Sequence, residues 1–128
     1  MRKRAVAVAV LAAAVFAAPS GARAGAFYDG RKLAEDCKQP DGSYSEGLCL
    51  GYVQGVADAI QVRAERRPDG TYEGLSPGGF RSCVPAAATA AQLEAIVQKW
   101  LAGHPQTWHL GAGSLVGKAL ADAFPCKS

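Results

Sequence analysis

Apolar residues recur at helical spacing along most of the chain, and residues 90–102 show the pattern most clearly. Apolar side chains there stand at i, i+3, i+4, i+7 and i+8: Leu93, Ile96, Val97, Trp100 and Leu101. Thr89 and Gln92 form a capping box before them, and Pro105 follows. Because this period places one apolar stripe on one face, the pattern predicts an amphipathic helix over 90–102.

A second helix is predicted over residues 44–67. Ser43 and Glu46 form a capping box at its start. One apolar face is shared by Cys49, Tyr52, Val53, Val56 and Ile60. Gly51 and Gly55 lie four residues apart on a neighbouring part of the surface, where they permit another backbone to approach closely.

Two more helices are predicted, over residues 29–38 and 107–124. Asp29 is the expected N-cap of the first, and Pro125 stops the apolar stripe of the second. Residues 68–82 are rich in Gly and Pro and show no convincing strand alternation, so they are predicted to be a long loop. The expected fold is therefore all-α, a small domain of four helices in two hairpins joined by that loop.

The first 24 residues have the pattern of a secretory signal peptide. The basic MRKR start is followed by an apolar run from Ala5 to Ala18 and by the small-x-small sequence Ala22-Arg23-Ala24. This run is shorter than the roughly 20 apolar residues that a membrane-spanning helix needs. We expect a single domain, residues 25–128, to be released into the periplasm without membrane attachment.

Removal of that segment changes the net charge. Four of the 14 Lys and Arg residues lie in it, which leaves ten basic residues against 11 acidic ones. The mature domain is therefore close to neutral. Its charge gives no support to nucleic-acid binding, which depends on a strongly basic surface.

The chain contains four cysteines, Cys37, Cys49, Cys83 and Cys126. An even number in an exported domain favours two disulfides, and no pair has the C-x₂₋₄-C spacing of a zinc site. In an antiparallel helical hairpin, the end of the second helix lies beside the start of the first. We therefore expect Cys37–Cys49 and Cys83–Cys126, while the pairing of Cys49 with Cys83 and Cys37 with Cys126 stays open from sequence alone.

His104 and His109 are the candidate acid-base residues. Their spacing fits neither an i,i+4 pair nor a zinc-protease motif, and no Ser or Cys nucleophile motif accompanies them. His104 follows the end of a predicted helix, where it is placed to cap the last carbonyls. We predict no catalytic residue, no metal site and no cofactor.

Several motifs occur in a characteristic order: FYDGRKLAEDC from Phe27, CLGYVQGVADA from Cys49, CVPAAATAAQLEAIVQKWLAGHP from Cys83 and LVGKALADAFPC up to Cys126. In order and spacing the chain resembles the Tai/Rap immunity family, periplasmic proteins that protect bacteria from type VI secretion amidase effectors. The resemblance implies a small all-α, disulfide-bonded protein, often a homodimer, that binds and blocks a peptidoglycan amidase.

The expected function is therefore that of a non-enzymatic immunity protein whose partner is a peptidoglycan amidase effector. A periplasmic helical chaperone or stress protein, or a binding protein without an amidase partner, is the alternative. An enzyme ranks third because it would rest on the two histidines only.

An inhibitor must place side chains in the cleft of its target, and loops on a rigid frame do this at low entropic cost. The long loop offers Tyr72 and Leu75 as apolar anchors, with Asp69 and Glu73 beside them. A competing contact site is the corner before the last helix, at Gln106, Thr107 and His109. A mobile linker without partner contacts is the simpler interpretation of the loop.

Overall fold

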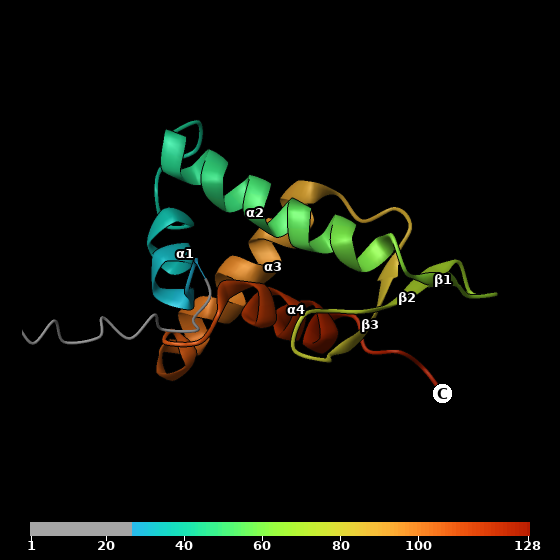
Figure 1. The fold of residues 1–128 in the computed structure, drawn as a ribbon. Coiled ribbons are helices and arrows are strands. Elements are labelled where there is room, and N and C mark those ends of the chain that lie inside the picture. The colour runs from blue at the N-terminus through green and yellow to red at the C-terminus, as the bar shows by residue number, and fades with distance from the viewer. Residues whose placement is uncertain (1–26) are drawn as a thin grey trace, which may run out of the picture.

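The computed structural model describes residues 27–128, so the predicted signal peptide, residues 1–24, lies outside the described part of the chain. The elements follow in the order α1 (Gly30–Asp36), α2 (Tyr44–Gln61), β1 (Glu65–Arg66), β2 (Thr71–Leu75), β3 (Arg81–Pro85), α3 (Ala90–Gly103), a short 3₁₀ helix (Pro105–Thr107) and α4 (Ala112–Ala123). Figure 1 shows α1 at one end of the domain and the strands, with the C-terminus, at the other.

Three helices begin where the capping signals placed them. The side chain of Asp29 accepts a hydrogen bond from the Lys32 backbone N–H at 2.9 Å. Ser43 and Thr89 do the same for residues three positions later, each at 3.2 Å. These bonds satisfy backbone donors that have no partner within the first helical turn, so the predicted starts of α1, α2 and α3 are confirmed.

The all-α prediction is wrong, because residues 65–85 form a three-stranded antiparallel sheet in the order β1-β2-β3. Gly70, with φ +83°, ends a tight turn in which its N–H bonds to the Arg67 carbonyl at 3.1 Å. Residues 76–80 close the second hairpin through a bond from the Ser76 N–H to the Phe80 carbonyl at 2.9 Å. All but Gly74 of the Gly and Pro residues that indicated a loop are thus turn residues of two hairpins, and Gly74 lies within β2.

The boundaries of α2 and α4 also differ from the prediction. α2 ends at Gln61 rather than at residue 67 because Glu65 and Arg66 pair with β2 instead of continuing the helix. α4 begins at Ala112 rather than at residue 107, since the preceding corner is held by residues before α1: Ala112 N–H donates to the Tyr28 carbonyl at 2.9 Å. Long-range pairing has overridden local helical propensity at both places.

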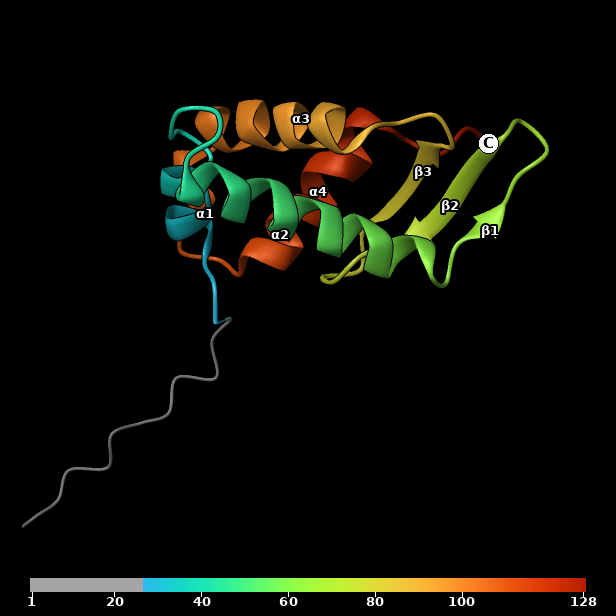
Figure 2. The same cartoon turned by 90° about the horizontal axis from the view of Figure 1, so that it is seen from above.

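The core lies between the helices. α2 and α3 run side by side along the domain with α4 packed against them, as the view in Figure 2 shows. The largest fully buried apolar side chains come from all four helices: Leu33, Val53, Val97, Leu101, Val116 and Leu120. Within residues 27–128, no helix is both long enough and apolar enough to cross a membrane.

Candidate functional site

Two disulfides anchor the surfaces on which the candidate residues lie. Cys37–Cys49 links the end of α1 to α2, with a Cα–Cα distance of 5.0 Å, and Cys83–Cys126 links β3 to the C-terminal tail, with 4.9 Å. The expected pairing is therefore the one observed. The surroundings of Cys83 differ from the prediction, because Cys83 lies in a strand and not just before a helix. The Cys83 backbone N–H donates to the Phe124 carbonyl at 2.8 Å.

The predicted apolar anchors of the long loop lie on opposite faces of the sheet. Side chains alternate along β2, so Tyr72 points to the same side as Gly74, and Gly74 packs so closely on α2 that a Cβ there would overlap Ile60. Tyr72 is half-buried on this inner side. Leu75 points to the outer side and is 65% exposed. The structure thus offers one of the two predicted anchors to a partner.

The two predicted acidic contact residues are engaged within their own chain. Glu73 forms ion pairs with Arg67 and, at 3.1 Å, with Arg81. Asp69 accepts hydrogen bonds from the Thr71 hydroxyl at 2.7 Å and the Thr71 N–H at 3.0 Å, and these bonds lower the pKa of Asp69. Glu73 therefore connects β2 to the arginines on either side of it, whereas Asp69 holds the turn before β2.

The outer side of the sheet forms a shallow depression of about 270 Å³. It is lined by Arg63, Glu65, Glu73, Gly74, Leu75 and Arg81. Leu75 is its large apolar side chain, with charges of both signs around it. We call this surface, defined by those six residues, the sheet-end surface.

Glu73 also lies within 4.8 Å of the sulfur atoms of Cys83 and Cys126. Metal binding by cysteine requires the thiolate, whereas both sulfurs are consumed here by the disulfide. Glu73 is neutralised by arginines as well. In its oxidised form this group does not present a set of metal ligands.

The corner before α4 places its two histidines in different roles. His104 Nδ1 lies 2.7 Å from the Trp100 carbonyl, and its ring stacks on the Trp100 indole with centroids 4.0 Å apart. Its backbone carbonyl accepts from the Thr107 hydroxyl at 2.8 Å. His104 thus caps the end of α3, as predicted. Gln106 and His109 are exposed at the tip of the corner.

The two predicted contact sites are not brought together. The corner lies beside α1, because Arg31 N–H donates to the Trp108 carbonyl at 3.0 Å. The strands occupy the opposite end of the domain in both views (Figures 1 and 2). A partner surface centred on Leu75 and one centred on His109 are therefore distinct alternatives.

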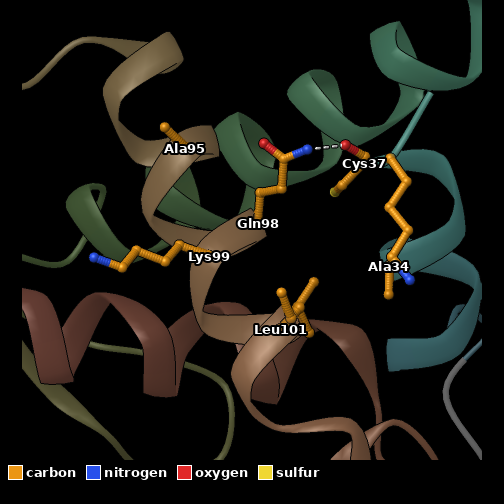
Figure 3. A pocket seen from close by; sticks show the side chains of 8 residues that line it. Ala34, Cys37, Ala95, Gln98, Lys99 and Leu101 are labelled. Atoms are coloured by element: carbon orange, nitrogen blue, oxygen red, sulfur yellow. Dashed lines mark hydrogen bonds between the residues drawn. The ribbon is translucent and has the colours of Figure 1, made fainter. Parts of the chain in front are cut away.

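A groove between α1 and α3 was not anticipated from the sequence. It has a volume of about 350 Å³ and is lined by Ala34, Cys37, Lys38, Ala95, Gln98, Lys99, Leu101 and Ala102. Gln98 lies in its middle and donates a hydrogen bond to the Cys37 carbonyl (Figure 3). Its three alanines, Ala34 in α1 and Ala95 and Ala102 in α3, did not indicate a groove in the sequence, because the groove forms only when α1 and α3 pack together.

A second cavity, of about 330 Å³, lies between α3 and α4. Its lining is mainly apolar and includes Phe80, Trp100, Leu110 and Leu115. The Trp100 indole N–H donates to Asp122 at 2.9 Å, and Lys118 pairs with the same carboxylate. Trp100 is thus fixed in position rather than free to fill the cavity.

The outward face of α2 carries mainly apolar and small residues, with the exposed carboxylate of Asp58 among them. Tyr44 and Val62 are more than 80% exposed, and Leu48 is 38% exposed. A Cβ added at Gly51 or Gly55 would meet no atom within 4 Å, so this strip lies at the surface rather than in the core. The sequence indicated the glycine strip, but the apolar residues in line with it were not recognised as exposed.

The chain matches the model of a protein family over most of its length. The model of the family described as Rap1a immunity proteins matches residues 29–126, which include all four helices, the sheet and both disulfides. No curated protein matches the chain.

Proposed function

Because the chain belongs to the Rap1a immunity protein family, a family of type VI secretion immunity proteins, we propose that it acts in the periplasm by binding and inhibiting a peptidoglycan amidase effector. Membership of an immunity family implies a cognate effector protein as the partner. The family match over residues 29–126 is the observation that carries the proposal.

The periplasm as the site of action is supported by two features. The N-terminal segment has the charge and apolar pattern of a signal peptide. The described residues contain two disulfides and no free cysteine. Disulfides form and persist in oxidising compartments, which agrees with export.

The sheet-end surface is the proposed site of effector contact. Leu75 is a large apolar side chain held at 65% exposure, and the ion pairs of Glu73 with Arg67 and Arg81 fix the strands beneath it. An anchor presented on a rigid frame loses little conformational entropy on binding. Tyr72 has no direct part in this contact because it faces α2.

The test is binding to a type VI peptidoglycan amidase effector of the same bacterium, measured by calorimetry with purified proteins. Leu75→Ala is expected to weaken binding by more than about 2 kcal/mol, as removal of a buried anchor does. His109→Ala serves as the matched control at the corner and is expected to leave affinity unchanged. The opposite result would assign the contact to Gln106, Thr107 and His109 instead.

A homodimer through the outward face of α2 is the second part of the proposal. Two pairs of residues on this face are arranged symmetrically about Val53: Gly51 mirrors Gly55, and Tyr44 mirrors Val62, whereas Leu48 mirrors the carboxylate Asp58. An antiparallel pair of α2 helices would therefore place each Tyr44 against the partner's Val62, with glycines at the crossing. Such self-complementarity is what a two-fold interface requires.

Light scattering at tens of micromolar protein tests the dimer. The unaltered mature protein is expected to give a dimer mass, and Val62→Asp a monomer mass, because the substitution buries two unpaired carboxylates in the interface. A monomer mass for the unaltered protein would contradict this part of the proposal.

A further inference from the structure

Arg67 connects three segments of the chain at the sheet end. Its backbone N–H donates to the Thr71 carbonyl at 2.9 Å and closes the turn between β1 and β2. Its guanidinium group pairs with the Glu73 carboxylate in β2 and donates from Nη2 to the Lys127 carbonyl in the C-terminal tail at 2.7 Å. One residue of the turn thus also holds a residue 60 positions further along the chain.

These contacts form a closed path with the second disulfide. Glu73 is paired in register with Cys83 of β3, and Cys83 is bonded to Cys126 in the tail. The residue after Cys126 is Lys127, which accepts the hydrogen bond from Arg67. Figure 2 shows the C-terminus close to β2 and β3. The tail and the sheet are therefore held together from two sides, by the disulfide and by Arg67.

The path passes directly beside Leu75. Glu73 and Leu75 lie on the same outer face of β2, because alternate side chains of a strand point to the same side. Leu75 is paired in register with Arg81, whose guanidinium nitrogen lies 3.1 Å from Glu73 Oε1. The Arg67 side chain is 25% exposed and that of Arg81 63%. The pair of Glu73 with Arg67 is therefore the less screened of the two.

A guanidinium group suits this position because it is a planar fork with several N–H donors. Nη1 of Arg67 faces the Glu73 carboxylate, and Nη2 faces the Lys127 carbonyl. A lysine ammonium group is a compact point charge at the end of a flexible stem. It can pair with the carboxylate, but it does not hold both acceptors in this geometry.

We propose that Arg67 is a positioning residue of the sheet-end surface: it ties the C-terminal tail to β2 and so holds Leu75 where the effector contacts it. The inference rests on the proposed contact between Leu75 and the effector. Arg67 lies outside the six residues of that surface and acts through Glu73. Without the Arg67 fork, the tail and the turn move independently of β2, and the arrangement that binds is a smaller fraction of the folded protein.

The variant Arg67→Gln tests the positioning without any partner. In the mature protein, amide hydrogen exchange in β2 is expected to become about threefold to tenfold faster. The ¹³C-methyl NMR signals of Leu75 should shift, whereas those of Val97 and Leu101 in the core should stay in place. Unchanged exchange in β2 together with unchanged Leu75 signals would overturn the proposal.

Arg66→Gln is the matched control. Arg66 is the preceding residue, is exposed, and has no ion pair among residues 27–128. Its replacement makes the same change in charge and is expected to leave the exchange in β2 and the Leu75 signals unchanged. An equal effect of Arg66→Gln and Arg67→Gln would show a general charge effect and contradict the role of Arg67.

Arg67→Lys separates the fork from the charge. It keeps a positive charge beside Glu73 but loses the simultaneous bond to the Lys127 carbonyl. The exchange rate of β2 is expected to lie between those of the unaltered protein and Arg67→Gln. Full recovery with lysine would show that charge alone is sufficient and would contradict the link through the tail.

A double-mutant cycle with the amidase effector tests whether Arg67 acts through Leu75. Calorimetry should show binding about threefold to tenfold weaker for Arg67→Gln. This loss should disappear when residue 75 is already alanine, because no anchor remains to be positioned. Equal losses in both backgrounds would overturn the proposal. If the unaltered protein does not bind the effector, the proposed function fails, while exchange in β2 still decides whether Arg67 positions Leu75.

Discussion

The substitution Asp36→Asn tests how the start of the domain is held to its core. Asp36 is 2% exposed and accepts hydrogen bonds from the Tyr28 hydroxyl and the Lys32 ammonium group. The Tyr28 ring in turn lies 4.8 Å from that of Tyr52 in α2. The buried carboxylate thus connects α1 to Tyr28 in the segment before it, and Tyr28 in turn packs on α2.

The expected cost follows from these contacts. A hydrogen bond to a buried charged group contributes about 1.5–3 kcal/mol, whereas the pair with Lys32 counts for less than about 1 kcal/mol because the lysine side chain is half exposed. Asparagine keeps the shape but loses the charge. We therefore expect Asp36→Asn to lower the free energy of unfolding by about 2–3 kcal/mol in urea denaturation at pH 7.

Asp122→Asn is the matched control. Asp122 also pairs with a lysine one turn earlier and accepts from an aromatic side chain, Trp100, but its side chain is 42% exposed. Its replacement is expected to cost less than about 1 kcal/mol. Equal costs for the two variants would refute the argument that burial sets the value of the Asp36 contacts.

The pH dependence gives a second test. Burial alone would raise the pKa of Asp36, but the hydrogen bonds from Lys32 and Tyr28 outweigh it and leave the pKa below its usual value of 3.8. A lowered pKa in the folded state stabilises the protein above the unfolded pKa, and this stability is lost as the pH falls through the folded value. The difference between native protein and Asp36→Asn should therefore shrink below about pH 4; a constant difference would contradict the assignment.

Three further variants have expected outcomes that unfolding measurements can check. Replacing both Cys83 and Cys126 by serine should lower the free energy of unfolding by about 4 kcal/mol, because a loop of 43 residues is no longer closed in the unfolded chain; a loss under 1 kcal/mol would contradict this. Gly117→Ala should destabilise by about 1–3 kcal/mol, since its Cβ would overlap Ser76, whereas Gly103→Ala, in the last turn of α3, has open space and should raise the melting temperature. The reverse order would show that α4 does not press on the second hairpin.

The starts of the helices could be predicted because the signals that set them are local. Asp29, Ser43 and Thr89 each bond a backbone N–H within their own first turn. The disulfide pairing favoured from the sequence is also the one observed, since the antiparallel course of α3 and α4 brings the ends of this segment together whether Cys83 lies in a helix or a strand. Local signals and simple topology were sufficient for these features.

The sheet could not be predicted by the same reasoning because its stabilisation comes from distant contacts. β2 is held by pairing with β3 and by the close approach of Gly74 to Ile60, neither of which appears as apolar alternation in the sequence. The Pro-Asp-Gly sequence at residues 68–70 was the available turn signal. If this sequence is interpreted as the turn of a hairpin, the predicted helix must end before residue 67. Tyr72 and Leu75 then lie on the following strand, three residues apart and therefore on opposite faces.

The surroundings of the candidate contact residues could be predicted only in part, for a related reason. Leu75, Gln106 and His109 are exposed, as a contact residue must be. Glu73 pairs with arginines that only the folded sheet brings beside it, whereas Asp69 bonds to Thr71 within the same turn. The groove between α1 and α3 combines residues from two distant segments, so no single stretch of sequence indicates it.

Inhibition of a type VI peptidoglycan amidase effector of the same bacterium tests the proposed function most directly. The purified mature domain, titrated into that amidase with isolated peptidoglycan as substrate, should abolish peptide release at one immunity chain per amidase chain. The same domain with both disulfides reduced and alkylated serves as the control and should inhibit less. Full amidase activity in the presence of excess folded domain would contradict the proposed function.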